Sequence, residues 1–287
     1  MKPARRPFRR AAARGFTIVE FMVAVAIGLI ISLVIGQVFV GSRQSFNSQD
    51  DSARIQESMR YASQILTRTI RMAGYRNNTG IDPNTIFLKA SAPAISGADN
   101  VTTNGLPNGT NPVAPTGASP AVVPDTITVR YQGMGTGVTP PTTADGSVVD
   151  CFGNSIDLGV TAVSTFGIRP VTKADGSLSS SLFCSTDGGA TWPATNELVP
   201  DIDNMQLLYG VDTDNDGAAN AYVRIGDVTD IDSVVSVRVW LLVRSPTASN
   251  LTVTTMTYTL AGVNYSYTDR FVRRVLTTTI NLRNRTI

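Results

Sequence analysis

The stretch RGFTIVEFMVAVAIGLIISLVIGQVF, Arg14–Phe39, decides how this chain folds. It is apolar almost throughout and carries one carboxylate, Glu20, near its start. As a helix, residues 16–41 would extend about 39 Å, which exceeds the roughly 30 Å hydrocarbon core of a bilayer. A charge at the bilayer centre costs about 2.5–3.5 kcal/mol on insertion scales. Glu20 must therefore lie at shallow depth, be protonated, or have a partner.

The residues before this stretch orient it in a membrane. Residues 1–15, MKPARRPFRRAAARG, contain six basic residues and no acidic one, so the positive-inside rule holds them on the cytoplasmic side. The apolar run is not followed by the small-x-small cleavage site of an ordinary secretory signal. We therefore expect the run to stay in the mature protein and any cleavage to fall at the Gly15–Phe16 junction.

The string GFTIVE, placed between a basic leader and an apolar helix, resembles the processing signal of type IV prepilins. The resemblance implies that a prepilin peptidase cleaves after Gly15 and N-methylates Phe16. It also implies that Glu20, the fifth mature residue, acts in assembly. On a helix Glu20 lies about 6 Å along the axis from Phe16, so it can pair with its own freed amine or a neighbour's. A plain membrane anchor with an incidental glutamate is the alternative.

Glu20 also begins a row of small residues along the predicted helix. The members recur every four residues: Ala24, Gly28, Ser32 and Gly36. Such spacing lets helices approach closely in lipid, which predicts a packing groove for neighbouring pilin helices. The alternative is that Gly and Ala are simply frequent in membrane helices.

Beyond residue 41 the helical pattern continues in amphipathic form. Apolar residues recur at spacings of three and four: Ile55, Met59, Ala62, Leu66, Ile70 and Ala73. This pattern predicts a helix that ends at Gly74, where a left-handed cap suits glycine. A helix that is apolar on one side needs a surface to cover it.

Strand patterns dominate the second half of the chain and supply that surface. In SVVSVRVWLLVRS one face carries apolar residues: Val235, Val237, Val239, Leu241 and Val243. Ser236, Arg238 and Arg244 fall on the other face, which predicts an antiparallel sheet with one buried side. The fold class is therefore α+β, with a long N-terminal helix packed on a C-terminal antiparallel sheet. The resemblance to pilins implies the same, pilin-like fold.

The predicted organisation has five parts. They are a basic leader (1–15), a transmembrane helix (16–41), its amphipathic continuation (42–75), a loop-rich variable region (76–148) and the sheet domain (149–287). One strand, DTITVRYQG, interrupts the loop-rich region, with Ile127, Val129 and Tyr131 on one face. The strings LLYGVDTDNDG, VVSVRVWLLVRS and DRFVRRVLTTTINLRN resemble minor pilins of the PilW type.

Cys151 and Cys184 are the two cysteines of the chain. Because their segment is expected outside the cytoplasm, we predict a disulfide, which would stabilise the fold by about 3–4 kcal/mol in the chain-entropy model. Two unpaired buried thiols are the alternative.

The string DTDNDG places Asp212, Asp214 and Asp216 before Gly217, as in the opening of a calcium loop. The twelfth position is Val223 rather than the bidentate glutamate of an EF-hand, so Asp227, Asp230, Asp232 or water would have to complete the site. The alternative is a hairpin turn, where Asp, Asn and Gly are common. Ca2+ is thus a possible cofactor, and no other is expected.

The composition argues against an enzyme and against a nucleic-acid partner. The chain contains no histidine, the commonest general base and metal ligand. Without the six cationic residues of the leader, the net charge of +2 becomes −4. Five arginines gather near the C-terminus, and we expect a solvated sheet face there rather than a site for DNA: Arg270, Arg273, Arg274, Arg283 and Arg285.

The resemblance implies a minor type IV pilin that primes or caps pilus assembly. Its implied partners are other minor pilins, the major pilin, the prepilin peptidase, the inner-membrane assembly platform and membrane lipid. The implied location is the inner membrane, with a single pass and a periplasmic C-terminal domain, before assembly into the pilus. The alternatives are a type II secretion pseudopilin of the J type and a membrane-anchored adhesin that uses the Thr- and Pro-rich loops.

Overall fold

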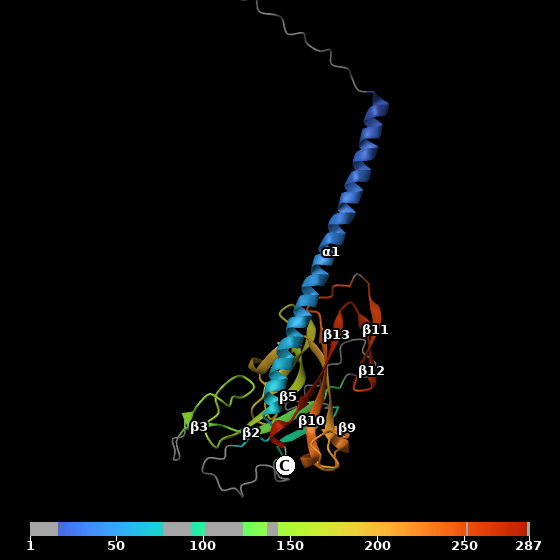
Figure 1. Ribbon diagram of the computed structural model, residues 1–287. Coiled ribbons are helices and arrows are strands. Elements are labelled where there is room, and N and C mark those ends of the chain that lie inside the picture. The colour runs from blue at the N-terminus through green and yellow to red at the C-terminus, as the bar shows by residue number, and fades with distance from the viewer. Residues whose placement is uncertain (1–16, 77–92, 101–122, 137–142, 251, 286–287) are drawn as a thin grey trace, which may run out of the picture. The chain divides into compact units, whose positions relative to one another are not determined.

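The computed structural model describes residues 17–76, 93–100, 123–136, 143–250 and 252–285 (Figure 1). The chain divides into two compact units, residues 1–49 and residues 50–287. One helix, α1 (Ile18–Arg71), contributes to both units. Its length and composition in the first unit would allow it to cross a membrane, with a mean hydropathy of 2.8 over its most apolar window.

The second unit consists of the end of α1 and a set of antiparallel strands. A five-stranded sheet has the order β1-β2-β5-β6-β7, and a four-stranded sheet has the order β13-β10-β8-β9. The hairpins β11–β12 and β3–β4 complete the strands of the described chain. The strands are β1 (Ile95–Ala98), β2 (Thr126–Gln132), β3 (Gly135–Thr136), β4 (Thr143–Ala144), β5 (Thr161–Thr172), β6 (Leu178–Ser185), β7 (Glu197–Pro200), β8 (Ile202–Val211), β9 (Ala221–Val223), β10 (Val234–Arg244), β11 (Thr254–Leu260), β12 (Val263–Asp269) and β13 (Arg273–Asn281).

The amphipathic half of α1 forms part of the main core, as its periodicity predicts. Ile55, Ala62, Leu66, Ile70 and Ala73 are buried, and Met59 packs against them while half-buried. The alternating apolar face of β10 from 237 to 243 belongs to the same core. Burial of each large aliphatic side chain contributes about 1.5–3 kcal/mol, so this interface fixes the helix on the sheet.

The C-terminal end of α1 is tied to both sheets. Gly74 has a φ of 73° and its N–H donates to the carbonyl of Arg130 on β2 at 2.9 Å. A left-handed glycine after the last turn is the cap that the sequence predicts. From the other sheet's side, the amide of Asn284 donates to the carbonyl of Arg71 at 3.2 Å. Carbonyls that a helix end leaves free are satisfied in this way.

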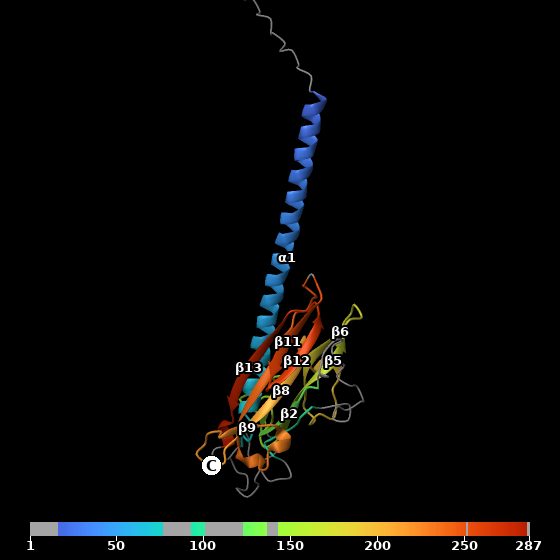
Figure 2. The same cartoon turned by 90° about the vertical axis from the view of Figure 1, so that its right-hand side faces the viewer.

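The second face of the four-stranded sheet is also covered, which corrects the prediction of a single buried side. Figures 1 and 2 show α1 and the hairpin β11–β12 on opposite faces of this sheet. Leu242 packs with Leu260, Tyr265 and Tyr267 of the hairpin. Ser236 and Arg244, predicted on a solvent face, are buried, whereas Val235 is half-buried.

The loop-rich region contributes more structure than predicted. The predicted strand is β2, and Ile127, Val129 and Tyr131 are fully buried in it. The short strands β1, β3 and β4 were not predicted, because two to four residues give no readable alternation. Through β1 and β2, the region supplies two strands of the five-stranded sheet.

The predicted disulfide is confirmed. Cys151 and Cys184 are bonded, with their Cα atoms 6.5 Å apart. The bond joins the turn after Asp150 to strand β6, so it anchors a loop to the five-stranded sheet.

Candidate functional site

The start of α1 is organised around Thr17. The carbonyl of Thr17 accepts the N–H of Phe21 at 3.1 Å, and its hydroxyl accepts the N–H of Glu20 at 3.2 Å. These contacts define an N-cap, which satisfies donors that a helix start leaves free. Glu20 lies in the first turn with an exposed side chain, where the helix dipole favours a negative charge. Gly15 and Phe16 lie outside the described residues.

The row of small residues is exposed along the first unit. Ala24, Gly28, Ser32 and Gly36 are all exposed, and a Cβ added at either glycine would meet no atom within 4 Å. The hydroxyl of Ser32 donates to the carbonyl of Gly28 at 2.9 Å, so its polar group is satisfied within the helix. From Ala24 to Gly36 the row therefore carries no side chain larger than that of serine, and the serine hydroxyl is hydrogen-bonded within the helix.

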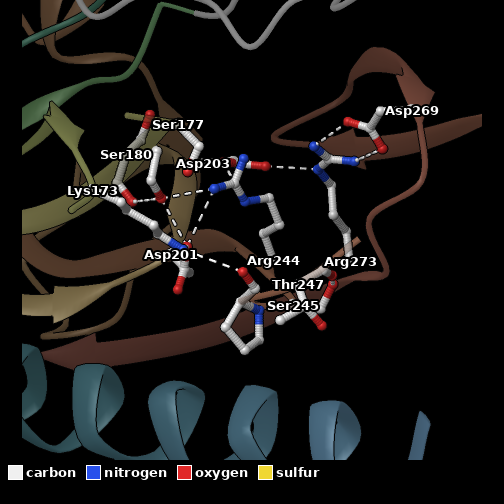
Figure 3. A network of polar contacts seen from close by, with 12 residues as sticks. Lys173, Ser177, Ser180, Asp201, Asp203, Arg244, Ser245, Thr247, Asp269 and Arg273 are labelled. Atoms are coloured by element: carbon white, nitrogen blue, oxygen red, sulfur yellow. Dashed lines mark hydrogen bonds and ion pairs between the residues drawn. The ribbon is translucent and has the colours of Figure 1, made fainter. Parts of the chain in front are cut away.

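Six charged residues of the second unit form an ionic cluster (Figure 3). They are Lys173, Asp201, Asp203, Arg244, Asp269 and Arg273. They come from β8, β10, β12, β13 and the ends of β5 and β7. The cluster therefore links both sheets and the β11–β12 hairpin.

Asp203 lies at the centre of the ionic cluster. Its carboxylate is 2.6 Å from Arg273 Nε and 3.8 Å from Arg244 Nε, and all three side chains are at most 5% exposed. Arg273 also makes a bidentate contact with Asp269, at 2.7 and 2.8 Å. The guanidinium groups stack on rings as well, since Arg244 lies 4.2 Å from the centroid of Phe271. Such planar and bidentate recognition is specific to arginine.

Asp201 holds the other side of the ionic cluster. Its Oδ1 is 2.8 Å from Lys173 Nζ and 3.2 Å from Arg244 Nη2, and it accepts the hydroxyl of Ser179 at 2.7 Å. The backbone of Asp201 has a φ of 59°, a conformation that aspartate tolerates better than most residues. Its carbonyl accepts the N–H of Arg244 at 2.9 Å. Backbone and side chain thus bind the same arginine.

Burial and pairing act in opposite directions on these acids. Burial raises the pKa of Asp203, although Arg273 and Arg244 work against it. For Asp269 burial also opposes ionisation, but the hydrogen bonds from Arg273 and the Phe271 N–H lower its pKa overall. The cluster pairs each acid with one or more cations from another strand or strand end, so its geometry is that of a structural link between strands.

The C-terminal arginines do not share one surface. Arg273 is buried in the ionic cluster, whereas Arg274 and Arg283 are exposed and Arg270 donates to the carbonyl of Asn250 at 2.6 Å. The solvated face expected for all five is therefore wrong for Arg273. Asp269 ends β12 and Arg273 begins β13, so the short connection between the strands brings the two side chains together. Their spacing in the sequence was the signal that could have predicted this pair.

The acidic string DTDNDG forms the turn between β8 and β9. The hairpin pairs Tyr209 with Val223 and Val211 with Ala221, which confirms the predicted turn. Ligand oxygens of Asp212, Asp214 and Asp216 lie within 4.8 Å of one another. Asp212 accepts the N–H groups of Asn215 and Gly217, both at 2.8 Å. Asp230, considered as an extra ligand, instead accepts the N–H of Asp232 at 2.9 Å.

Comparison with known proteins gives matches at both ends of the chain. Residues 168–284 match the family described as Type IV Pilus-assembly protein W, and residues 10–36 match the Prokaryotic N-terminal methylation motif. No curated protein matches. A type IV-like pilin from Thermus thermophilus is similar in structure, with 10% identity, a TM-score of 0.42, and coverage of 82% of this chain and 98% of the other. That likeness adds nothing to the assignment.

The two sequence matches agree with the geometry. The methylation motif spans the start of α1, and with the apolar helix it indicates a membrane-anchored pilin. The protein W match spans the strands from the middle of β5 to the end of β13. Because both matches indicate one system, the chain is a minor pilin of type IV pilus assembly.

Proposed function

We propose that this chain is made as a prepilin, is cleaved between Gly15 and Phe16, and enters a pilus with its second unit outside the cytoplasm. The observation that carries the proposal is the start of α1. There an exposed apolar helix holds one carboxylate, Glu20, in its first turn. Cleavage would free the α-amine of Phe16 about one turn from this carboxylate.

Glu20 is proposed to register the incoming subunit. An ionised glutamate in lipid is unfavourable unless it is paired. The N-terminal ammonium of a neighbouring pilin would offset that cost. The row of small residues from Ala24 to Gly36 would then allow the neighbour's helix to pack closely.

The role is structural and not enzymatic, and the partners are other minor pilins and the major pilin. We place the chain in the inner membrane with a periplasmic domain before assembly, and among the subunits that prime a pilus or remain at its tip. The ionic cluster and the Cys151–Cys184 bond support this role, because they join strands and a loop of the second unit to one another. The sequence matches favour neither a secretion pseudopilin nor an adhesin.

Mass spectrometry of the protein purified from membranes tests the processing step. The first residue should be N-methylated Phe16, and an intact leader or another start would refute the proposal. A deletion strain tests the assembly role when surface pili are counted with and without blocked retraction. Loss of pili in both backgrounds supports priming, whereas normal pili in both would refute it.

A further inference from the structure

From Val275 to Asn281, strand β13 leaves one edge of the four-stranded sheet open. Leu282 N–H donates to the carbonyl of Val235 at 2.8 Å, so even-numbered residues of this segment direct their backbone groups toward β10. Odd-numbered residues direct theirs outward: Val275, Thr277, Thr279 and Asn281. In the part of the chain that the structure describes, no hydrogen bond reaches these outward groups.

Beyond the two arginines at the start of β13, this edge lacks the features that usually prevent pairing with another chain. Protective edges carry charges, prolines or bulges. Residues 275–281, VLTTTIN, contain no charged residue and no proline, and their pairing with β10 shows no register shift. The segment is thus a regular template for a further strand.

An open groove of about 680 Å³ lies between β13 and α1. Its half-buried apolar members are Met59, Met72 and Leu276. Its exposed members include Arg60, Arg68 and Arg71, and no acidic residue of the described chain lines it. None of these arginines is in an ion pair with another described residue.

The helix dipole explains only part of this positive charge. Arg68 and Arg71 lie in the last turn of α1, where a cation is favoured by the dipole alone. Arg68 also donates to the carbonyl of Asp150 at 3.2 Å. Arg60 lies about three turns earlier, beyond the reach of the terminal charge. A cationic groove beside a free strand edge therefore needs a further reason.

We propose that β13 and this groove bind an extended, acidic segment of a partner protein as an added strand. The outward backbone groups of β13 would pair with the segment, and side chains on one of its faces would enter the groove. Alternation would place acidic residues against the arginines and apolar residues against Met59 and Leu276. A docked helix could not satisfy the strand edge, because its own backbone groups bond internally.

Photo-crosslinking in piliated cells tests the added strand. A photoreactive residue replaces Thr277, or in a second strain Thr279, in the full-length chain. Both positions should crosslink to one segment of one protein, at sites two residues apart, and the segment should carry acidic residues. Crosslinks to a helix or to unrelated segments, or no crosslink at either position, would overturn the proposal.

Charge and backbone are then tested separately with the Thr277 crosslinker. Arg60→Glu with Arg71→Glu should reduce the crosslink yield at least about ten-fold, whereas Arg54→Glu, outside the groove, should leave it unchanged. Thr279→Pro removes one outward N–H and should also reduce the yield, while Thr279→Ala keeps it. An unchanged yield in the double arginine variant would refute the acidic partner. Leader removal is measured in the same samples, so failed processing would refute the proposed function and leave these yields interpretable.

Discussion

Arg273 Nε lies 2.6 Å from Asp203 Oδ2 in the interior of the second unit, and neither side chain is more than 1% exposed. The pair joins β13 to β8, which are separated by β10 in the sheet. The carboxylate of Asp203 also lies near Arg244, so one acidic group interacts with two cations. This arrangement is sensitive to the loss of either partner, because an unpaired buried charge is far costlier than a paired one.

Arg273→Ala should therefore lower the free energy of unfolding by about 3–5 kcal/mol. Urea denaturation of the full-length protein in detergent measures the change. Arg54→Ala is the matched control, because Arg54 and Asp50 form an exposed pair at 2.9 Å, and solvent screening leaves such pairs with little effect on stability. Equal losses in the two variants would contradict the assignment of Asp203 as a fastening point.

Asp125 should make stability depend on pH. Burial raises its pKa to about 6, against the N–H donors of Asn100 and Leu207. The folded state thus holds this proton more tightly than the unfolded state, so stability is highest below the unfolded pKa and falls as pH rises toward 6. The loss amounts to about 3 kcal/mol at most. In Asp125→Asn, the free energy of unfolding should depend less on pH between pH 4 and 7. An unchanged pH dependence would show that another group titrates.

Glu20→Ala should abolish incorporation into pili and leave the chain in the membrane. The carboxylate is exposed in the first turn of α1 and Thr17 caps the helix without it, so the helix should still form. Pilus counts and membrane fractionation measure the two effects. Thr17→Ser, which keeps the capping hydroxyl, serves as a control with normal assembly. Unchanged pili in Glu20→Ala would remove the proposed pairing.

Gly28→Leu combined with Gly36→Leu should impair assembly without straining the chain itself. No atom lies within 4 Å of a Cβ at either glycine, and leucine is the better helix former. The expected defect is thus in packing against a neighbouring helix. Val34→Leu adds bulk outside the row and should assemble normally. If both variants form pili equally well, the row is only membrane-helix composition.

Asp212→Ala should destabilise the β8–β9 hairpin with or without calcium, because it leaves the N–H groups of Asn215 and Gly217 without their acceptor. Urea denaturation should show a lower free energy of unfolding for this variant. Calorimetry with calcium addresses the metal separately. Saturable heat that disappears in Asp214→Asn with Asp216→Asn would support a calcium loop. If the heat persists in this variant, or if the original chain shows no heat, the string forms a hairpin turn and no calcium site.

The long elements were predictable because their periodicity states which face is buried. The sequence pattern of α1 from Ile55 to Ala73 and that of β10 from Val237 to Val243 both match the core. Alternation in one strand cannot reveal what covers its opposite face. The groups that surround Arg244 are Asp201, Asp203 and the ring of Phe271, which lie far from it along the chain, so the sequence did not show that this arginine is buried.

The site was predictable only where chemistry is local in sequence. The disulfide was predicted from the two cysteines and from the expected location of their segment outside the cytoplasm. The acidic turn was predicted from the string DTDNDG. The ionic cluster draws on six residues spread from 173 to 273, and such a set becomes visible only after the sheets assemble. Gly15 and Phe16, read from a motif alone, remain predictions.

The contacts that end α1 have a mechanical meaning. In a pilus of the kind proposed above, a force applied along α1 would reach the second unit through residues 50–71, which belong to its core. The N–H of Gly74 is hydrogen-bonded to the carbonyl of Arg130 in the five-stranded sheet. The side-chain amide of Asn284, which follows β13, is hydrogen-bonded to the carbonyl of Arg71. A force that reaches the C-terminal end of α1 would therefore be distributed over both sheets.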